Sequence, residues 1–253
     1  MTWIAENLGD GKNCFFGRDG GCSEGKYKGL NVNTKSLDDA ENIAKNLDIA
    51  AAKVGLKKDD LVLLNQGVSN VAVFVTEASC DKIVADGIVT NVKNIGLCIR
   101  TADCAPVLFR DDKANVIGAA HAGWRGAYKG IIENVINLMI EKGAKVENIA
   151  AAVGPCIGQK SYEVDVSFYN QFIEADKTFK KYFIEGIREG FYQFDLQEFC
   201  VDKLKKSGVK NIEVANHDTY EMEENYFSFR RCTHRNLVEK AKDFATELSV
   251  IVL

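Results

Sequence analysis

Histidine and proline are scarce in this chain of 253 residues, and charge of neither sign dominates it. The sequence contains 3 His and 2 Pro, and its formal net charge is −4 at pH 7. Multicopper centres need many histidines, so we do not expect copper as a cofactor. The mild net acidity gives no support for nucleic acid or an anionic membrane as a partner. No stretch approaches the roughly 18 consecutive apolar residues of a membrane span, so we expect no membrane contact.

Several motifs of well-known enzyme classes are also missing. The chain has no Walker A sequence, no GxGxxG after a strand, no HExxH and no GxSxG, so we expect no nucleotide cofactor held by those devices. The first residues, MTWIAENLGDGKN, contain no basic segment followed by an apolar one. We therefore expect no signal peptide and a cytoplasmic location. The 8 Cys form no CxxC pair, which predicts mostly reduced, buried thiols.

The pattern of apolar residues predicts a mixed fold. Apolar residues make up 46% of the chain and no repeat or Pro/Ser-rich linker divides it, so we predict one domain over residues 1–253. Strands are expected at 61–65, 71–75, 83–90, 96–101, 105–109 and 115–120. Helices are expected at 37–54, 127–142, 195–206 and 235–247, a shaped loop at 14–33 and an apolar tail at 250–253. This mixture predicts an α/β (mixed α+β) class.

One cysteine and one histidine stand at the ends of two neighbouring strand-like runs. Cys104 lies in TADCAPVLF and His121 in NVIGAAHAGWRG, at a separation that a strand hairpin can close. A thiolate and an imidazole brought together can bind a borderline metal such as Zn²⁺. They can equally form a nucleophile and its base. The residues alone leave both possibilities open, beside the plain one of a buried thiol and a hydrogen-bonded histidine.

Arginines near turns are candidates for holding phosphate or carboxylate. Arg18 lies in the glycine-rich GRDGGCSEG, Arg125 in GWRG before a predicted helix, and Arg230 after the aromatic run YFSF. Guanidinium groups bind such anions through paired hydrogen bonds. The face of Trp124 could stack on a planar base. The alternative is that the arginines are solvated or ion-paired and that Trp124 fills the edge of the core.

Taken together, these stretches resemble the YfiH family, the laccase-domain or "polyphenol oxidase" proteins regarded as purine nucleoside phosphorylases. The matching segments run in family order from about residue 14 to 235: GRDGGCSEGKYKGLNVN, LNQ, ADGIVT, TADCAPVLF, GAAHAGWRGAYKG, VGPCIGQKSYEV and FSFRR. TADC followed by HAGWRG is far more specific than a generic metal motif. The resemblance implies a single domain with internal mixed β-sheets covered by helices.

The resemblance also implies an activity and a site. It implies phosphorolysis of adenosine, inosine, guanosine or methylthioadenosine in purine salvage, with phosphate as co-substrate, and a second activity of adenosine deamination. The family's zinc site uses a histidine from a QVH[GS]N motif, the cysteine of TADC and the first histidine of HAGWRG. By this resemblance the last two ligands correspond to Cys104 and His121, which are therefore expected to be metal ligands and catalytic residues. By the same resemblance Arg18 and Asn31 are expected to line the pocket.

The first metal ligand of the family does not carry over. Where the family has QVHSN, this chain has QGVSN, so Val68 takes the position of the histidine. Valine offers no lone pair, and zinc held by Cys104 and His121 alone is expected to bind weakly or not at all. Cys80, Asp86 or Ser69 could substitute only if the fold brings one of them near. Three hypotheses follow: a purine nucleoside phosphorylase, a metal-independent cysteine hydrolase, and a non-catalytic member that binds a purine or a protein partner.

Overall fold

The strands form two large sheets that pack against each other. The computed structural model describes residues 1–9, 11–79, 82–238 and 240–253. The first sheet has the order β1-β2-β14-β6-β3 and the second β13-β9-β7-β8-β5-β4. The first contains Thr2–Trp3, Asn13–Phe16, Glu247–Val252, Gly96–Thr101 and Leu61–Leu63 in that spatial order. The second contains Asn211–Val214, Ala150–Val153, Ala105–Asp111, Val116–Ala122, Gly87–Thr90 and Ala72–Phe74.

Alternation along the strands divides the core into layers. In β7, Leu108 packs in the layer between the two sheets, while its neighbours Val107 and Phe109 point to the opposite face, because successive side chains of a strand alternate. Leu97 and Ile99 of β6 meet Leu108 from the other sheet in the same inner layer. Central strands are therefore buried on both faces, which explains their nearly continuous apolar sequence.

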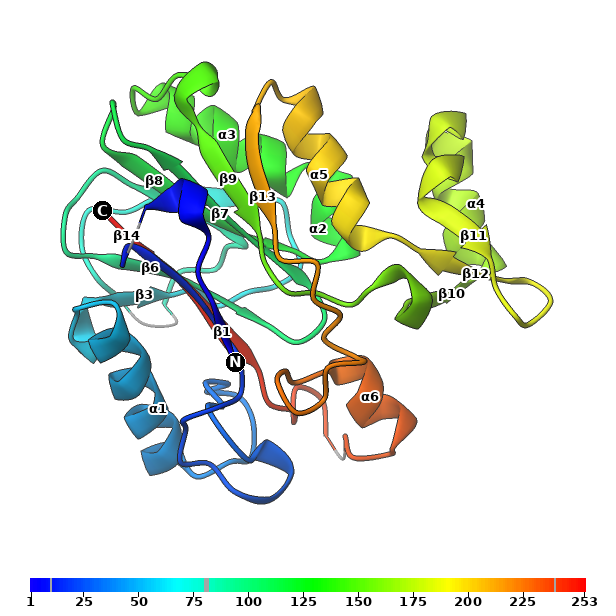
Figure 1. Cartoon of the computed structure of the whole chain (residues 1–253), viewed down its shortest axis with the longest axis horizontal. Helices are drawn as coiled ribbons and strands as arrows, with labels where there is room; N and C mark the ends of the chain where they lie inside the picture. Colours follow the sequence, from blue (N-terminus) through cyan, green and yellow to red (C-terminus); the bar gives the residue numbers. More distant parts are fainter. Residues whose placement is uncertain (10, 80–81, 239) are drawn as a thin grey trace.

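Helices cover the outer faces of both sheets (Figure 1). α1, Ala40–Lys53, packs Ile43 and Leu47 against the outer face of the five-stranded sheet. The other α-helices are α2 (Trp124–Lys129), α3 (Ile131–Glu141), α4 (Val166–Ala175), α5 (Leu196–Lys206) and α6 (Phe229–His234). Of these, α2, α3 and α5 pack on the six-stranded sheet. Short 3-10 helices lie at Glu6–Leu8, Gly25–Tyr27, Lys58–Asp60, Val146–Asn148, Gln159–Ser161 and Lys177–Tyr182.

A small third sheet extends to one side of the molecule (Figure 1). It has the order β10-β12-β11, formed by Glu163–Asp165, Phe191–Phe194 and Phe183–Glu185. Helix α4 packs on it through an aromatic cluster in which the rings of Tyr169 of α4 and Tyr192 of β12 stack 4.0 Å apart. No helix in the described part of the chain is long and apolar enough to cross a membrane.

The predicted fold class, the six predicted strands and the helices near 37–54 and 195–206 are confirmed. The strands β1, β2 and β9 to β13 were not predicted, and β2 takes up the first three residues of the loop predicted at 14–33. The helix expected at 127–142 is divided, because Gly130 adopts a left-handed conformation with φ of 93° and separates α2 from α3. The first helix is capped by Asp39, whose side chain accepts two backbone N–H groups, and begins three residues later than predicted.

The helix predicted at 235–247 is wrong. Helix α6 ends at His234, and Asn236 and Lys242 adopt positive φ angles of 55° and 70°, which an α-helix excludes. The carboxylate of Asp243 is buried and accepts hydrogen bonds from Lys26 and Tyr27, far away in the sequence. These tertiary contacts outweigh local helix propensity. The predicted tail at 250–253 belongs to β14, a central strand of the first sheet.

Candidate active site

The β7–β8 hairpin brings Cys104 and His121 together. Cys104 directly precedes β7, and Pro106 of β7 pairs in register with His121 of β8. The Cys104 thiol lies close enough to the His121 imidazole to raise its pKa. Gly123 makes room for them, because a Cβ atom there would lie 2.9 Å from the Cys104 Sγ and 3.7 Å from the His121 Nε2. The Nε2 edge of the imidazole therefore faces the thiol.

Asp86 holds the other edge of the imidazole. Its Oδ1 lies 2.7 Å from the Nδ1 of His121, and its side chain is fully buried at the start of β5. The same carboxylate accepts the backbone N–H groups of Gly67, Val68 and Ser69 and the Ser69 hydroxyl. One buried carboxylate thus orients the imidazole and anchors the loop at 67–69, in a Cys–His–Asp arrangement.

The surroundings of His121 and Asp86 shift the pKa values of both groups. Burial by itself lowers the pKa of His121, but the adjacent Cys104 and Asp86 outweigh it and raise this pKa to about 10. Burial raises the pKa of Asp86, whereas hydrogen bonds from His121 and Ser69 and the charge of His121 lower it to a net value of about 2. His121 and Asp86 therefore form an imidazolium–carboxylate pair at neutral pH.

A cavity of about 300 Å³ opens over the thiol and the imidazole. It is lined by Asn33, Lys35, Gln66, Val68, Arg100, Thr101, Ala102, Cys104, His121, Phe229, Lys242, Phe244 and Thr246. The rings of Phe229 and Phe244 lie 4.7 Å apart and are inclined at 57°, which makes an aromatic wall. The volume is at the lower end of the range for small-molecule pockets, about 300–1,000 Å³.

The donor set does not fit the implied metal. Val68 lines the cavity beside Cys104 and His121, where the family's third ligand is expected, and no cluster of three or more His, Cys, Asp or Glu donors exists among the described residues. The Asp86 carboxylate contacts the Nδ1 edge of the imidazole and accepts the Ser69 hydroxyl. Neither Asp86 nor Ser69 therefore replaces the missing ligand. Cys80 lies outside the described residues. Two protein donors fall short of the three that catalytic zinc sites use.

The other two histidines do not converge on this pair. The Nδ1 of His217 lies 2.8 Å from the Tyr226 hydroxyl, and the Nδ1 of His234 lies 3.0 Å from the Tyr220 hydroxyl. Neither histidine lines the cavity. A multicopper centre, which needs several converging imidazoles, has no counterpart in these contacts.

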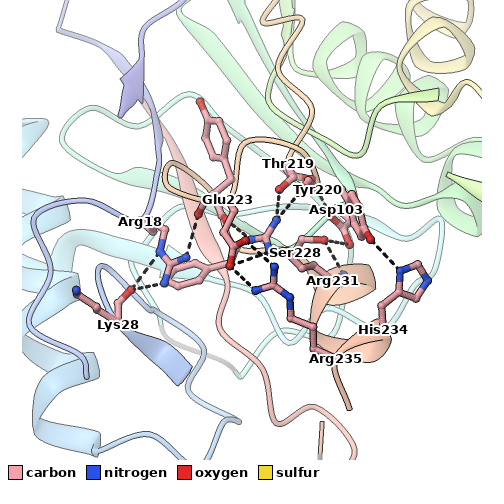
Figure 2. Close-up of polar contacts among 12 residues, drawn as sticks. Arg18, Lys28, Asp103, Thr219, Tyr220, Glu223, Ser228, Arg231, His234 and Arg235 are labelled. Atoms are coloured by element: carbon pink, nitrogen blue, oxygen red, sulfur yellow. Dashed lines mark hydrogen bonds and ion pairs between the residues drawn. The ribbon is translucent and has the colours of Figure 1, made fainter. Parts of the chain in front are cut away.

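The arginines expected to hold phosphate lie elsewhere. Figure 2 shows Arg18 directed at backbone carbonyls of Lys28 and Glu223, to which it donates hydrogen bonds. Arg125 is exposed and lies over the ring of Trp124 at 4.3 Å. Arg230 donates to the Glu163 carbonyl, 2.8 Å away. None of the three arginines lines the cavity.

Burial corrects the expectation for Asn31 and selects, for Trp124, the alternative that it fills the edge of the core. Asn31 is completely buried and lies behind the cavity, where its Oδ1 accepts the N–H groups of Asn33 and Thr246, two residues that do line it. Trp124 packs on Phe168 with the rings 4.5 Å apart, so it fills the core edge rather than offering a free face to a base. Asn31 therefore supports the cavity wall from behind.

A buried polar network fixes the turn that carries Cys104 (Figure 2). Asp103 adopts a φ of 80°, and its carboxylate accepts hydrogen bonds from the Thr219 hydroxyl, the Ser228 hydroxyl and the Arg230 N–H at 2.7–2.9 Å. Ser228 caps α6, which begins with the cavity residue Phe229. One carboxylate thus holds the cysteine turn and the aromatic wall in a fixed relation.

Sequence reasoning named Asp86 only as a possible substitute metal ligand, and it missed both the pairing of Asp86 with His121 and much of the cavity wall. Asp86 lies in ADGIVT, a segment of the resemblance to which no role was given. Phe229 is next to the predicted Arg230, whereas Lys35, Arg100 and Lys242 carry no local signal. Their common place on one cavity is a property of the tertiary structure.

Comparison with known proteins agrees with this fold and these motifs. The family described as "Multi-copper polyphenol oxidoreductase laccase" matches residues 12–237. A purine nucleoside phosphorylase of Rickettsia prowazekii is 43% identical over 199 residues, which cover 79% of this chain and 81% of that protein. A crystal structure of a Neisseria meningitidis protein aligns with a TM-score of 0.86 at 30% identity, over 100% of this chain and 98% of that one.

A second solved structure carries the family's name. The YfiH protein of Bacillus licheniformis has a TM-score of 0.86 and 28% identity, over 95% of this chain and 92% of that chain. The sequence match and the two structural matches each extend over most of the chain and agree with the motif order in the sequence. This chain belongs to the YfiH family, whose domain is described as a multi-copper polyphenol oxidoreductase laccase.

Proposed function

We propose that this protein is a purine nucleoside phosphorylase that acts on adenosine, inosine, guanosine or methylthioadenosine. The observation that carries the proposal is that an oriented imidazolium, His121, and an aromatic wall of Phe229 and Phe244 share one cavity. Relatives that bear the name purine nucleoside phosphorylase support it. Aromatic side chains bind planar bases by stacking, and an imidazolium can donate the proton that a departing base needs.

The chemistry follows from the position of that proton. A phosphate oxygen attacks C1′ of the ribose and the C1′–N9 bond breaks, so the bonding electron pair moves onto the purine. His121 donates its Nε2 proton to N7 of the departing base, and Asp86 holds the imidazole in the orientation that this transfer needs. Cys104, beside the imidazole, raises the pKa of His121 and so favours its protonated form. No step uses a metal, because the donor set does not fit one.

Adenosine deamination, the second activity that the resemblance implies, is not part of the proposal. Deaminases of this chemistry use a zinc-activated water to attack C6 of adenine. With Val68 in place of the third ligand, the cavity supplies no comparable way to activate water. Phosphorolysis needs only phosphate as the nucleophile.

The direct test is product analysis. Purified protein is incubated with inosine and phosphate, and hypoxanthine and ribose 1-phosphate are quantified by chromatography, with water in place of phosphate as the control. We expect phosphate-dependent hypoxanthine from the natural protein and a loss of at least 100-fold in His121→Ala, from the loss of general-acid catalysis. Absence of hypoxanthine at high enzyme concentration contradicts the proposal.

The Cys–His–Asp arrangement favours a second candidate, a cysteine hydrolase with Cys104 as nucleophile. Nucleophile, base and an orienting third group are the signature of such enzymes. The two candidates differ in what Cys104→Ser does. A nucleophilic role predicts complete loss of turnover and a covalent intermediate visible by mass spectrometry, whereas the phosphorylase proposal predicts partial activity and no adduct.

The third hypothesis, a non-catalytic purine binder, is tested with the same purified protein. Isothermal titration calorimetry with inosine measures binding independently of turnover. Binding without hypoxanthine, and without a covalent adduct on Cys104, would select this hypothesis over both enzymes.

A further inference from the structure

One ring of the aromatic wall belongs to a stretch of chain outside any helix or strand. Phe244 lies three residues before β14 begins, so no regular ladder of hydrogen bonds holds its backbone. This stretch is joined instead to a segment near the N-terminus. The Val32 N–H donates to the Thr246 carbonyl at 3.3 Å, and the Leu37 N–H donates to the Asp243 carboxylate at 2.9 Å. The place of the Phe244 ring in the cavity therefore depends on contacts between residues that are far apart in the sequence.

Asn33 contacts the backbone of Phe244 directly. Its side-chain NH₂ donates to the Phe244 carbonyl at 2.7 Å and to the Lys242 carbonyl at 3.0 Å, and its Oδ1 accepts the Lys35 N–H at 3.0 Å. Asn33 is only 7% exposed, and the low dielectric of a buried site strengthens such hydrogen bonds. One amide thus ties the residues on both sides of Asp243 to the N-terminal segment.

The Asn33 amide is itself held in a fixed direction. The Asn33 N–H donates to the Oδ1 of Asn31 at 3.0 Å, and the Asn33 carbonyl accepts the N–H and the hydroxyl of Ser36 at 3.1 and 2.8 Å. Asn31 is completely buried. A supporting side chain whose own backbone is fixed in this way holds its partner within a narrow range of positions.

Asn33 lines the cavity together with Phe229 and Phe244, but it has no donor left for a ligand. An asparagine amide carries two N–H groups, and both are used on the carbonyls of Lys242 and Phe244. Its Oδ1 already accepts the Lys35 N–H. The hydrogen bonds of Asn33 therefore serve the protein, and its effect on a ligand passes through the wall that it holds.

We propose that Asn33 is a positioning residue for the aromatic wall, which holds the Phe244 ring against Phe229 in the arrangement on which a planar base stacks. The two rings lie 4.7 Å apart and are inclined at 57°, so a shift of the Phe244 backbone changes the face that the base meets. The identity of the base as a purine rests on the proposed function, whereas the fixing of the wall does not. His121 is held separately by Asp86, so Asn33 acts on the binding of the base and not on the transfer of the proton.

Two variants and two matched controls isolate this contact. Asn33→Asp keeps the shape and the acceptor of the side chain but removes both donors, and Asn33→Ala removes the whole contact. The controls are Asn7→Asp and Asn7→Ala. The Asn7 amide also donates to two backbone carbonyls, those of Ala151 at 2.9 Å and Asn211 at 3.4 Å, and Asn7 is not among the described residues that line the cavity. Circular dichroism and thermal unfolding establish that each variant is folded.

The first measurement is isothermal titration calorimetry with hypoxanthine and with adenine, in the absence of phosphate. Both Asn33 variants should bind both bases about 10-fold more weakly, which is the size of one lost stacking contact. The controls should bind like the natural protein. Weakening of one base alone would show a direct hydrogen bond from residue 33 to that base, and equal weakening in the controls would show a general loss of stability. Either result overturns the positioning role.

A double-mutant cycle tests whether Asn33 acts through Phe244. Phe244→Ala should weaken base binding by itself, and adding Asn33→Ala to it should cause less than about 2-fold further loss, because residues that act through one contact are not additive. Unchanged base binding in Phe244→Ala would refute the proposal. A full 10-fold effect of Asn33→Ala in the Phe244→Ala background would refute it as well.

Alkylation of Cys104 separates the positioning role from the proposed function, because Cys104 lines the same cavity. Iodoacetamide should modify Cys104 at least about 5-fold faster in the Asn33 variants, the effect of removing one net hydrogen bond from a local opening, and at the natural rate in the controls. In steady-state phosphorolysis the Asn33 variants should raise the KM for inosine about 10-fold and leave kcat within about 2-fold. Faster alkylation in a protein that binds no purine would refute the purine site and retain the positioning role. Phosphorolysis with natural KM and natural alkylation rate in both Asn33 variants would refute the positioning role and retain the phosphorylase.

Discussion

Replacing Val68 by histidine tests both the geometry and the metal reasoning of the site. Val68 has a φ of 62°, a left-handed conformation that is an outlier for a β-branched residue, and its side chain lines the cavity with Cys104 and His121. Histidine and asparagine enter this conformation several-fold more readily than most residues. The substitution Val68→His therefore relieves strain and adds the third donor that the cavity lacks.

The two effects have different sizes and can be separated. A strained residue of this kind costs of order 1–3 kcal/mol, so Val68→Asn, which relieves the strain without an imidazole, should stabilise the protein by about 1 kcal/mol. For a chain of this size that corresponds to a rise in Tm of about 2–4 °C. Val68→His should match this rise without metal. With zinc at about 100 times its Kd it should gain about 2.7 kcal/mol more.

The assay combines metal analysis with thermal unfolding. Natural protein, Val68→Asn and Val68→His are prepared without a metal-binding tag, dialysed against zinc and then against buffer, and analysed by mass spectrometry for bound metal. Tm is measured with zinc and with a chelator. We expect stoichiometric zinc only in Val68→His, together with a zinc-dependent rise in Tm of about 5–10 °C that the chelator abolishes.

Two results would refute the reasoning. Stoichiometric zinc in the natural protein would show that a donor outside the described cluster completes the site. Equal zinc content and equal Tm in the histidine and asparagine variants would show that residue 68 does not face Cys104 and His121 closely enough to join them. A fall in Tm in Val68→Asn would remove the strain argument.

Three further predictions concern protonation and the buried polar groups. Because Cys104 and Asp86 raise the pKa of His121 to about 10, turnover that needs the imidazolium should persist from neutral pH and fall as pH rises toward 10; Cys104→Ser should move that fall to lower pH in a kcat profile. Asp103→Asn leaves a buried donor without an acceptor and should lower the free energy of unfolding by about 1–3 kcal/mol. It should also change the rate at which iodoacetamide alkylates Cys104. An unchanged alkylation rate would refute the positioning role of Asp103. Burial raises the pKa of Asp243, but hydrogen bonds from Lys26 and Tyr27 lower it by more, so the net pKa is below the usual value. The stabilising contribution of Asp243 is therefore complete above the unfolded pKa of about 3.9 and is lost as pH falls through the folded value. Asp243→Asn should make the free energy of unfolding in urea depend less on pH between pH 5 and pH 2, and an unaltered pH dependence there would contradict this assignment.

Local patterns predicted the elements whose structure depends on nearby residues. The hairpin that pairs Cys104 with His121 follows from two apolar runs joined by a short polar turn, and the antiparallel register then places the two side chains at one end. The helices α1 and α5 follow from apolar spacing, and in the structure Asp39 and Asp195 cap them. In each case the contacts that decide the structure lie within a few residues along the chain.

Predictions that depended on the partner of a long side chain were wrong or incomplete. An arginine in a glycine-rich loop has the same sequence signal whether it binds phosphate or backbone carbonyls, and Arg18 binds the carbonyls of Lys28 and Glu223. The helix predicted at 235–247 failed for a related reason, since the partners of Asp243 lie more than 200 positions away. Sequence spacing carries no information about such contacts.

By itself, the sequence determined the family, the strand hairpin, the thiol–imidazole pair and the replacement of a metal ligand by Val68. Only the tertiary structure decided that Asp86 orients His121 and that Lys35, Arg100 and Lys242 share its cavity. The physical reason is the range of the interactions. Periodicity, capping and hairpin register act over short stretches of chain. The cavity wall, in contrast, is held by hydrogen bonds such as that from Asn33 to the carbonyl of Lys242, which joins residues 209 positions apart in the sequence.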